Sequence, residues 1–148
     1  MKNPLTEKSY LLFISWFVST IATLGSLYFS EIRGFIPCEL CWFQRIFMYP
    51  LPLILGISIF QNDFSAKKYV LPMAIIGWGI SIYHYLLQKV PGFAEIKPCS
   101  SGVPCSGEYI NWLGFITIPF LALMAFSIIM VSMIGIYIKE RKEKVKGK

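Results

Sequence analysis

Charged side chains are scarce in this chain of 148 residues: they make up 15% of it, with eight acidic residues and a single histidine. Soluble globular domains carry about 25% charged residues, so the composition excludes an ordinary soluble domain. The chain also has no GxGxxG sequence, no P-loop and no Ser-His-Asp signature, which leaves the common soluble chemistries without support. Apolar residues dominate instead, at 55% of the chain, and they include 12 Phe, 8 Tyr and 4 Trp.

The apolar residues are gathered into four long stretches. A transmembrane helix needs about 20 mostly apolar residues to cross about 30 Å of hydrocarbon. The stretches that meet this requirement are about residues 10–29, 42–60, 69–87 and 112–138. The first is too long for a typical signal-peptide core, so we interpret it as a retained span. We therefore predict an all-α fold: one transmembrane domain over residues 1–148, an integral membrane four-helix bundle with two outer loops that carry cysteines.

Prolines and small residues predict local features of these spans. Pro50 and Pro52 fall inside the second span and Pro119 inside the fourth, so we predict a kink in each, because proline removes a helical hydrogen bond. Small side chains allow neighbouring helices to approach closely. The third span carries three of them: Gly77, Gly79 and Ser81.

Positive charge is unevenly divided between the two ends of the spans. Ten of the fourteen basic residues precede the first span, join the second to the third, or follow the fourth, in the basic tail 139–148. The opposite side holds only Arg33, Arg45, Lys89 and Lys97. The positive-inside rule then predicts that both termini are cytoplasmic. The basic tail is expected to lie near anionic lipid, and we expect no nucleic-acid partner.

All four cysteines, Cys38, Cys41, Cys99 and Cys105, fall on the outer side, where an oxidising compartment favours disulfides. Cys38 and Cys41 form a CxxC pair at the mouth of the second span, and a helix N-terminus favours a thiolate. A structural disulfide would close too small a loop to stabilise much. A Cys₄ zinc site is the other alternative, but five residues separate Cys99 from Cys105, longer than the usual spacing. Redox exchange, with no bound metal, is the interpretation we adopt.

Two further side chains are candidates for the same site. Arg45 follows Cys41 by four residues, so on a helix it shares the face of Cys41 about one turn deeper. It either extends to the headgroups or holds a carbonyl-bearing electron acceptor. His84, near the outer end of the third span, either makes a hydrogen bond between helices or transfers protons. The outer loop pair, Cys99 and Cys105, is either a structural staple or an exposed disulfide that a partner thiolate attacks.

The combination of these motifs resembles the DsbB family of membrane disulfide-bond oxidoreductases, in its Gram-positive, BdbC-like branch. The resemblance extends over essentially the whole chain. The motifs that carry it are Pro37-Cys38-x-x-Cys41-Trp42-x-Gln44-Arg45, His84-Tyr85-Leu86-Leu87-Gln88, the Cys99 and Cys105 pair, and Trp112-Leu113-Gly114-Phe115 with Ile118-Pro119.

On the quinone side, the resemblance implies that Cys38 and Cys41 deliver electrons to a membrane quinone. Cys41 would lie nearest the ring, Arg45 would donate a hydrogen bond to a quinone oxygen, and His84 would line the same site. The Gram-positive character favours menaquinone over ubiquinone. The protein would then be an enzyme, a quinone-dependent disulfide-generating oxidoreductase.

On the partner side, the resemblance implies that Cys99 forms a mixed disulfide with an extracytoplasmic thioredoxin-like protein, DsbA- or BdbD-like, and that Cys105 completes the pair. The chain would sit in the bacterial cell membrane with its cysteines extracytoplasmic. One alternative is a vitamin K epoxide reductase-like protein, in which the CxxC normally lies on a later helix. The other is a non-enzymatic membrane assembly protein whose disulfides are structural.

Overall fold

The structure, a computed structural model, describes residues 4–90 and 113–147. The described residues fold into five α-helices: α1 (Pro4–Leu27), α2 (Glu39–Met48), α3 (Pro50–Gln61), α4 (Lys67–Lys89) and α5 (Ile118–Lys146). A π-helical turn, Tyr28–Ile32, continues α1, and a 3₁₀ turn, Phe64–Ala66, precedes α4. The predicted all-α fold is confirmed.

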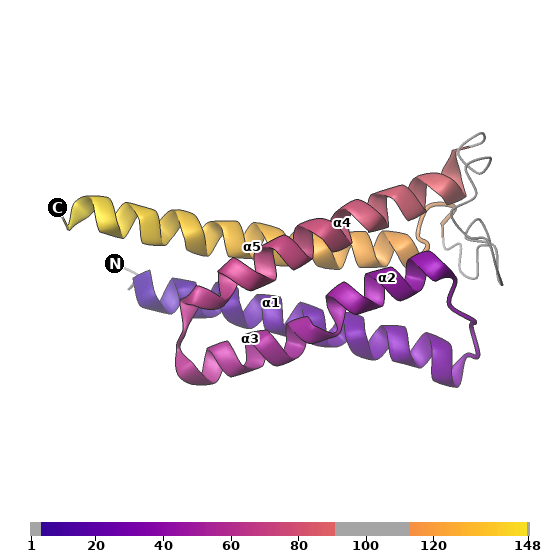
Figure 1. Cartoon of the computed structure of the whole chain (residues 1–148), viewed down its shortest axis with the longest axis horizontal. Coiled ribbons are helices and arrows are strands. Elements are labelled where there is room, and N and C mark those ends of the chain that lie inside the picture. Colours follow the sequence, from indigo (N-terminus) through magenta and orange to yellow (C-terminus); the bar gives the residue numbers. More distant parts are fainter. Residues whose placement is uncertain (1–3, 91–112, 148) are drawn as a thin grey trace.

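Four helical stretches are long and apolar enough to cross a membrane, which confirms the predicted four-helix membrane bundle. They are Thr6–Ile32, Glu39–Gln61, Phe64–Lys89 and Ile118–Lys146. Helix α5 packs against both α1 and α4, while α3 packs on α1 and α2 packs on α4. Both termini lie at one end of the bundle together with the turn between α3 and α4, and α2 begins at the opposite end (Figure 1). The CxxC pair is therefore a full bundle length away from the termini.

The second span is divided in two at Tyr49, as its prolines predict. Helix α2 ends at Met48 and α3 begins at Pro50. The Tyr49 N–H still bonds to the Arg45 carbonyl, but Pro50 has no N–H to continue the series, so α2 ends and α3 begins at this residue. The division lets α2 pack on α4 while α3 packs on α1.

The fourth span begins at Ile118 rather than near residue 112. Leu113 and Gly114 have φ values of 55° and 81°, a left-handed backbone that an α-helix does not use. The predicted kink at Pro119 is wrong, because this proline occupies the first turn of α5, where the helix needs no N–H from it. The helix also continues through most of the basic tail, to Lys146.

The core contains one very close contact between helices. A Cβ atom at Gly77 of α4 would overlap the Phe126 ring of α5, so only glycine leaves room for this fully buried ring. The predicted close approach is confirmed at Gly77. It is wrong at Gly79, which faces open space, with nothing within 4 Å of its Cβ position.

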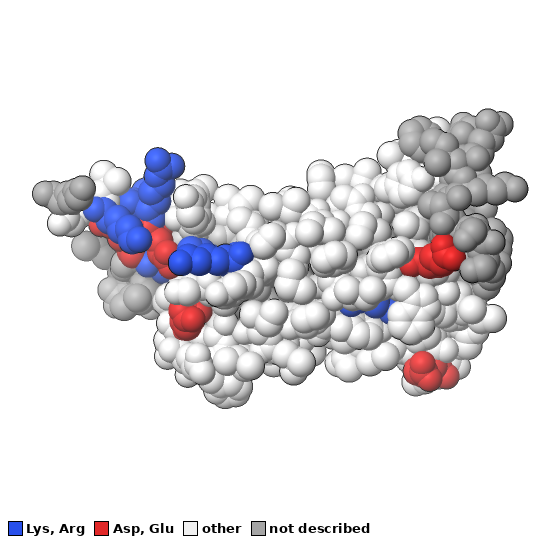
Figure 2. All heavy atoms as spheres, in the orientation of Figure 1, with Lys and Arg blue, Asp and Glu red and all other residues white. Residues whose placement is uncertain are grey.

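The middle of the bundle surface is apolar. Large hydrophobic side chains are exposed along it, with Leu53 at 71% and Val131 at 66%, as expected where lipid replaces water as the solvent. On the face shown in Figure 2, uncharged residues cover the middle, and Lys and Arg side chains gather at the end that holds the termini. Ion pairs tie the helices together at that end: Lys8–Glu143, Lys139–Glu7 and Lys67–Glu140.

Candidate functional site: a dithiol beside an apolar cavity

The CxxC pair lies at the N-terminus of α2. Cys38 is the N-cap residue, directly after Pro37, and Cys41 belongs to the first turn. Both thiols are free, and their Sγ atoms are 3.2 Å apart. Unpaired N–H groups and the positive end of the helix dipole favour negative charge at this position. The local sequence thus places two sulfur atoms within reach of a mutual bond where a thiolate is stabilised.

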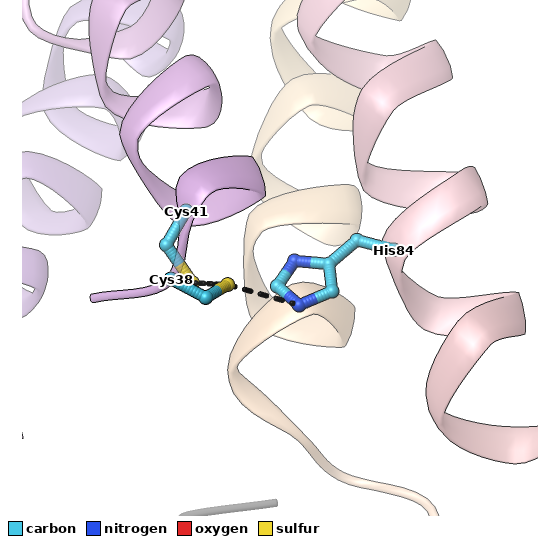
Figure 3. Close-up of side chains that lie close together, drawn as sticks. All are labelled: Cys38, Cys41 and His84. Atoms are coloured by element: carbon cyan, nitrogen blue, oxygen red, sulfur yellow. Dashed lines mark hydrogen bonds between the residues drawn. The ribbon is translucent and has the colours of Figure 1, made fainter. Parts of the chain in front are cut away.

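His84 of α4 approaches the same pair. Its Nε2 atom is 3.6 Å from Cys38 Sγ, and the three side chains converge from α2 and α4 in Figure 3. The imidazole is 1% exposed and Cys38 is 7% exposed. The other ring nitrogen, Nδ1, is buried and has no hydrogen-bond partner among the described residues. Nε2 is therefore the ring nitrogen that can exchange a proton with the Cys38 sulfur.

Cys38, which immediately precedes the second span, has an acidic thiol. Its pKa is lowered to about 4, chiefly because the Cys41 thiol donates a hydrogen bond to the thiolate. Burial opposes this shift, and the hydrogen bond and positive charge of His84 add to it. Since only the thiolate is a nucleophile, Cys38 is the sulfur of the pair prepared to attack at neutral pH.

A cavity of about 400 Å³ opens beside the other cysteine. Its walls come from α1 and its π-helical turn, residues 35–37, α2 and α5, and they are mostly aliphatic and aromatic. Cys41 and Arg45 line it together, on the shared helix face that their spacing predicts. Cys38 and His84 are not among its lining residues, so the two sulfurs have different neighbours. Cys38 contacts the histidine, whereas Cys41 borders the cavity.

Arg45 is held in place by α1. Its Nε donates to Ser26 Oγ at 2.9 Å and a terminal nitrogen donates to the Ser26 carbonyl at 3.3 Å. Tyr49 donates its hydroxyl to the same Ser26 Oγ at 3.3 Å, and the Trp42 ring lies 5.3 Å from the guanidinium. These contacts fix a cation against the cavity wall, which distinguishes Arg45 from a side chain that only extends to the headgroups.

Gln44 has a structural position in the same turn. It is buried, and its amide nitrogen donates to Ser81 Oγ of α4 at 3.2 Å. This bond ties α2 to α4 at the level of the dithiol and so helps to keep His84 beside Cys38.

Three atoms of the site have the donor types of a metal ligand set. The sulfurs of Cys38 and Cys41 and a ring nitrogen of His84 all lie within 4.8 Å of one another. The Cys₄ zinc alternative needs Cys99 and Cys105, which lie outside the described residues. Their roles remain predictions.

Sequence reasoning did not single out the α1 wall of the cavity or its hydroxyl partner Tyr49, which lies between α2 and α3. Gly25, Ser26 and Tyr49 all line the cavity, and Ser26 holds Arg45. A serine or a glycine within an apolar span is common in membrane helices. Only the packing of α1 against α2 shows their relation to Arg45.

Comparisons with known proteins identify relatives that form disulfide bonds, in keeping with the free CxxC pair. The family model described as "Disulfide bond formation protein DsbB" matches residues 8–136. The "Disulfide bond formation protein C" of Bacillus subtilis is 71% identical over 133 residues, 90% of this chain and 94% of its own length. The "Probable disulfide formation protein C 1" of Bacillus anthracis is 57% identical, covering 84% and 90% of the two chains. A "Probable disulfide formation protein" of Coxiella burnetii is 48% identical, covering 80% and 81%. No solved structure matches the chain.

Proposed function

Because the chain belongs to the DsbB family of disulfide bond formation proteins, we propose that it reoxidises an extracytoplasmic thioredoxin-like protein and passes two electrons to membrane quinone. Its family and its four apolar helices make it a multi-pass bacterial membrane oxidoreductase that forms disulfide bonds. One observation carries the quinone part of the proposal: a CxxC sulfur and a fixed cation line the same apolar cavity.

The cavity fits a quinone headgroup in size and character. Small-molecule sites typically measure about 300–1,000 Å³ and are mostly apolar with a few placed polar groups, and this one measures about 400 Å³. A Cβ atom at Gly25 would meet nothing within 4 Å, so the backbone of α1 borders open space. Aromatic walls with one cation and one thiol suit a flat, apolar ring that carries carbonyl oxygens.

Arg45 would bind a carbonyl oxygen of that ring. Its hydrogen bonds to Ser26 orient the guanidinium before any ligand arrives, which reduces the entropy lost on binding. A hydrogen bond to a charged group contributes about 1.5–3 kcal/mol. Cys41 lines the same cavity, so the sulfur and the cation would hold the ring between them.

A quinone, when bound, accepts two electrons and two protons. The chain supplies both when the Cys38 and Cys41 thiols close into a disulfide: one S–S bond forms, two S–H bonds break, and two electrons and two protons leave. His84 would hold the proton from Cys38 at Nε2, and Cys41 is the sulfur at the cavity. Cys38 would thus pass its proton to His84, whereas Cys41 would face the electron acceptor.

The second pair would supply electrons from the partner. A partner thiolate would attack Cys99, forming a mixed disulfide and breaking the Cys99–Cys105 bond, and the partner's second thiol would then release two reduced cysteines. These would reduce the Cys38–Cys41 disulfide in the same way. Menaquinone is the expected acceptor rather than ubiquinone. With cytoplasmic termini, the separation between the termini and α2 supports an extracytoplasmic CxxC.

A coupled assay tests the proposal. Purified full-length protein receives a reduced thioredoxin-like donor and a soluble menaquinone analogue, and oxidation of the donor and loss of the quinone are followed together. One quinone should be reduced for each donor disulfide formed, and Cys41→Ser should abolish turnover. Failure of the protein with all four cysteines to reduce the quinone, or full activity in Cys41→Ser, would overturn the proposal.

A further inference from the structure

Two of the three distances between donor atoms of the dithiol and His84 are close to those of a tetrahedral zinc site. Zinc binds sulfur at about 2.3 Å and nitrogen at about 2.0–2.1 Å, so adjacent tetrahedral ligands lie roughly 3.5–3.8 Å apart. Cys38 Sγ and His84 Nε2 are already 3.6 Å apart. The two sulfurs, at 3.2 Å, would have to separate by only about half an ångström, given those bond lengths. A rotation about the side-chain bonds of Cys41 would provide that change.

We propose that the reduced protein binds a thiophilic divalent cation of the zinc type through Cys38, Cys41 and His84. The three donor atoms come from two helices and lie within 4.8 Å of one another. Thiolate and imidazole are the ligands that zinc prefers, and three protein ligands leave one position for water. The inference goes beyond the proposed function, since binding needs neither quinone nor partner.

Metal binding and disulfide formation exclude one another. Binding releases the proton of the Cys41 thiol and the proton that His84 holds at Nε2, which leaves two metal-bound thiolates and a neutral imidazole, with no change in oxidation state. The Cys38–Cys41 disulfide has no thiolate to offer, so the site exists only in the reduced protein. A bound cation therefore holds the pair reduced and stops disulfide formation.

The surroundings of His84 make this a reversible site. Ligation through Nε2 leaves the proton on Nδ1, which is buried and has no hydrogen-bond partner among the described residues. Ligating histidines normally donate that proton to an acceptor, and removing the acceptor weakens metal binding by about 10–100-fold. The cation is thus an inhibitor that a chelator removes, in contrast to a permanent structural zinc.

Cobalt titration tests the site without any quinone. The full chain carries Cys99→Ser and Cys105→Ser, so that only the CxxC thiols remain, and Co²⁺ is added to the reduced protein. We expect one Co²⁺ per chain, with thiolate-to-cobalt charge-transfer bands and tetrahedral ligand-field bands that Zn²⁺ displaces. The oxidised protein should show neither set of bands.

Substitutions distinguish the proposed metal ligands from residues that do not bind the metal. Cys41→Ser leaves one thiolate and should weaken the thiolate bands, and both Cys41→Ser and His84→Ala should weaken Co²⁺ binding by at least about tenfold, since a lost direct ligand costs more than a lost outer partner. Gly79→Ala, which changes a residue of α4 that faces open space, should leave binding within threefold of the parent. Absence of tetrahedral bands in the reduced protein, or unchanged affinity in His84→Ala, would overturn the inference.

A second readout does not depend on whether the Cys41→Ser and His84→Ala variants fold. In membranes that contain the reduced protein with the Cys99→Ser and Cys105→Ser substitutions, Zn²⁺ should slow maleimide alkylation of Cys38 and Cys41, and EDTA should restore it. Alkylation that proceeds equally fast with and without Zn²⁺ would also overturn the inference.

Discussion

Gly25 offers a direct way to fill the proposed quinone site without disturbing the bundle. A Cβ at this position of α1 meets nothing within 4 Å, and the residue lines the cavity. Removing a buried leucine side chain leaves a cavity on the order of 150 Å³, so Gly25→Leu should fill roughly a third of the 400 Å³ space. Leucine is also favoured over glycine in a helix by up to about 1 kcal/mol, so folding should be unaffected.

The expected effect is on binding of the acceptor. If the leucine displaces one or two methylene-sized contacts of the ligand, each worth about 0.8 kcal/mol, the KM for the quinone should rise about tenfold, which corresponds to about 1.4 kcal/mol. The KM for the reduced donor protein should stay within twofold of the unsubstituted protein. The assay is steady-state quinone reduction over a range of quinone concentrations, with donor protein in excess.

Gly79→Leu is the matched control. It makes the same substitution at a helical glycine that also faces open space, but on α4 and outside the cavity lining. Its KM for the quinone should equal that of the unsubstituted protein. Equal KM values for Gly25→Leu and Gly79→Leu would refute the assignment of the cavity as the acceptor site.

Three further predictions test other parts of the account. Arg45→Met should raise the KM for the quinone at least tenfold, because it removes a charge-assisted hydrogen bond of about 1.5–3 kcal/mol. Since the pKa of Cys38 is about 4, its alkylation rate should stay level from pH 8 to pH 6 and halve near pH 4; in His84→Ala the midpoint should move to higher pH, and an unmoved midpoint would count against the thiolate–imidazole contact. Gly77→Ala should lower the free energy of unfolding by about 1–3 kcal/mol through overpacking, with Gly79→Ala as the control, and a thermal melt that does not distinguish them would contradict the packing argument.

The prolines show how far sequence reasoning reaches in this fold. Pro50 divides the second span as predicted, while Pro119 merely opens α5 and Pro72 lies inside α4, which continues through it. Position explains Pro119, because the first turn of a helix needs no N–H, whereas Pro50 and Pro72 both follow helical residues and only Pro50 interrupts the helix. Hydropathy predicts the four spans but not where each helix begins. The fourth begins only after Thr117, whose backbone is extended, with φ −116° and ψ 167°.

The candidate site could likewise be predicted from the sequence only in part. Helical spacing alone places Arg45 on the face of Cys41, and both line the cavity. The family resemblance assigns His84 to the quinone side, yet the structure places its ring against Cys38. Depth along a span does not determine which side of a dithiol a residue on another helix approaches. The α1 partner Ser26 is invisible to sequence reasoning for a related reason: its role depends on packing between helices.

A single-turnover experiment tests the central claim most directly. The fully reduced protein with Cys99→Ser and Cys105→Ser is mixed without oxygen with one equivalent of a menaquinone analogue, and the quinol and the Cys38–Cys41 disulfide are quantified by absorbance and mass spectrometry. We expect one quinol and one Cys38–Cys41 disulfide per chain, with no reaction in Cys41→Ser. Quinone that stays oxidised beside a reduced CxxC pair would contradict it.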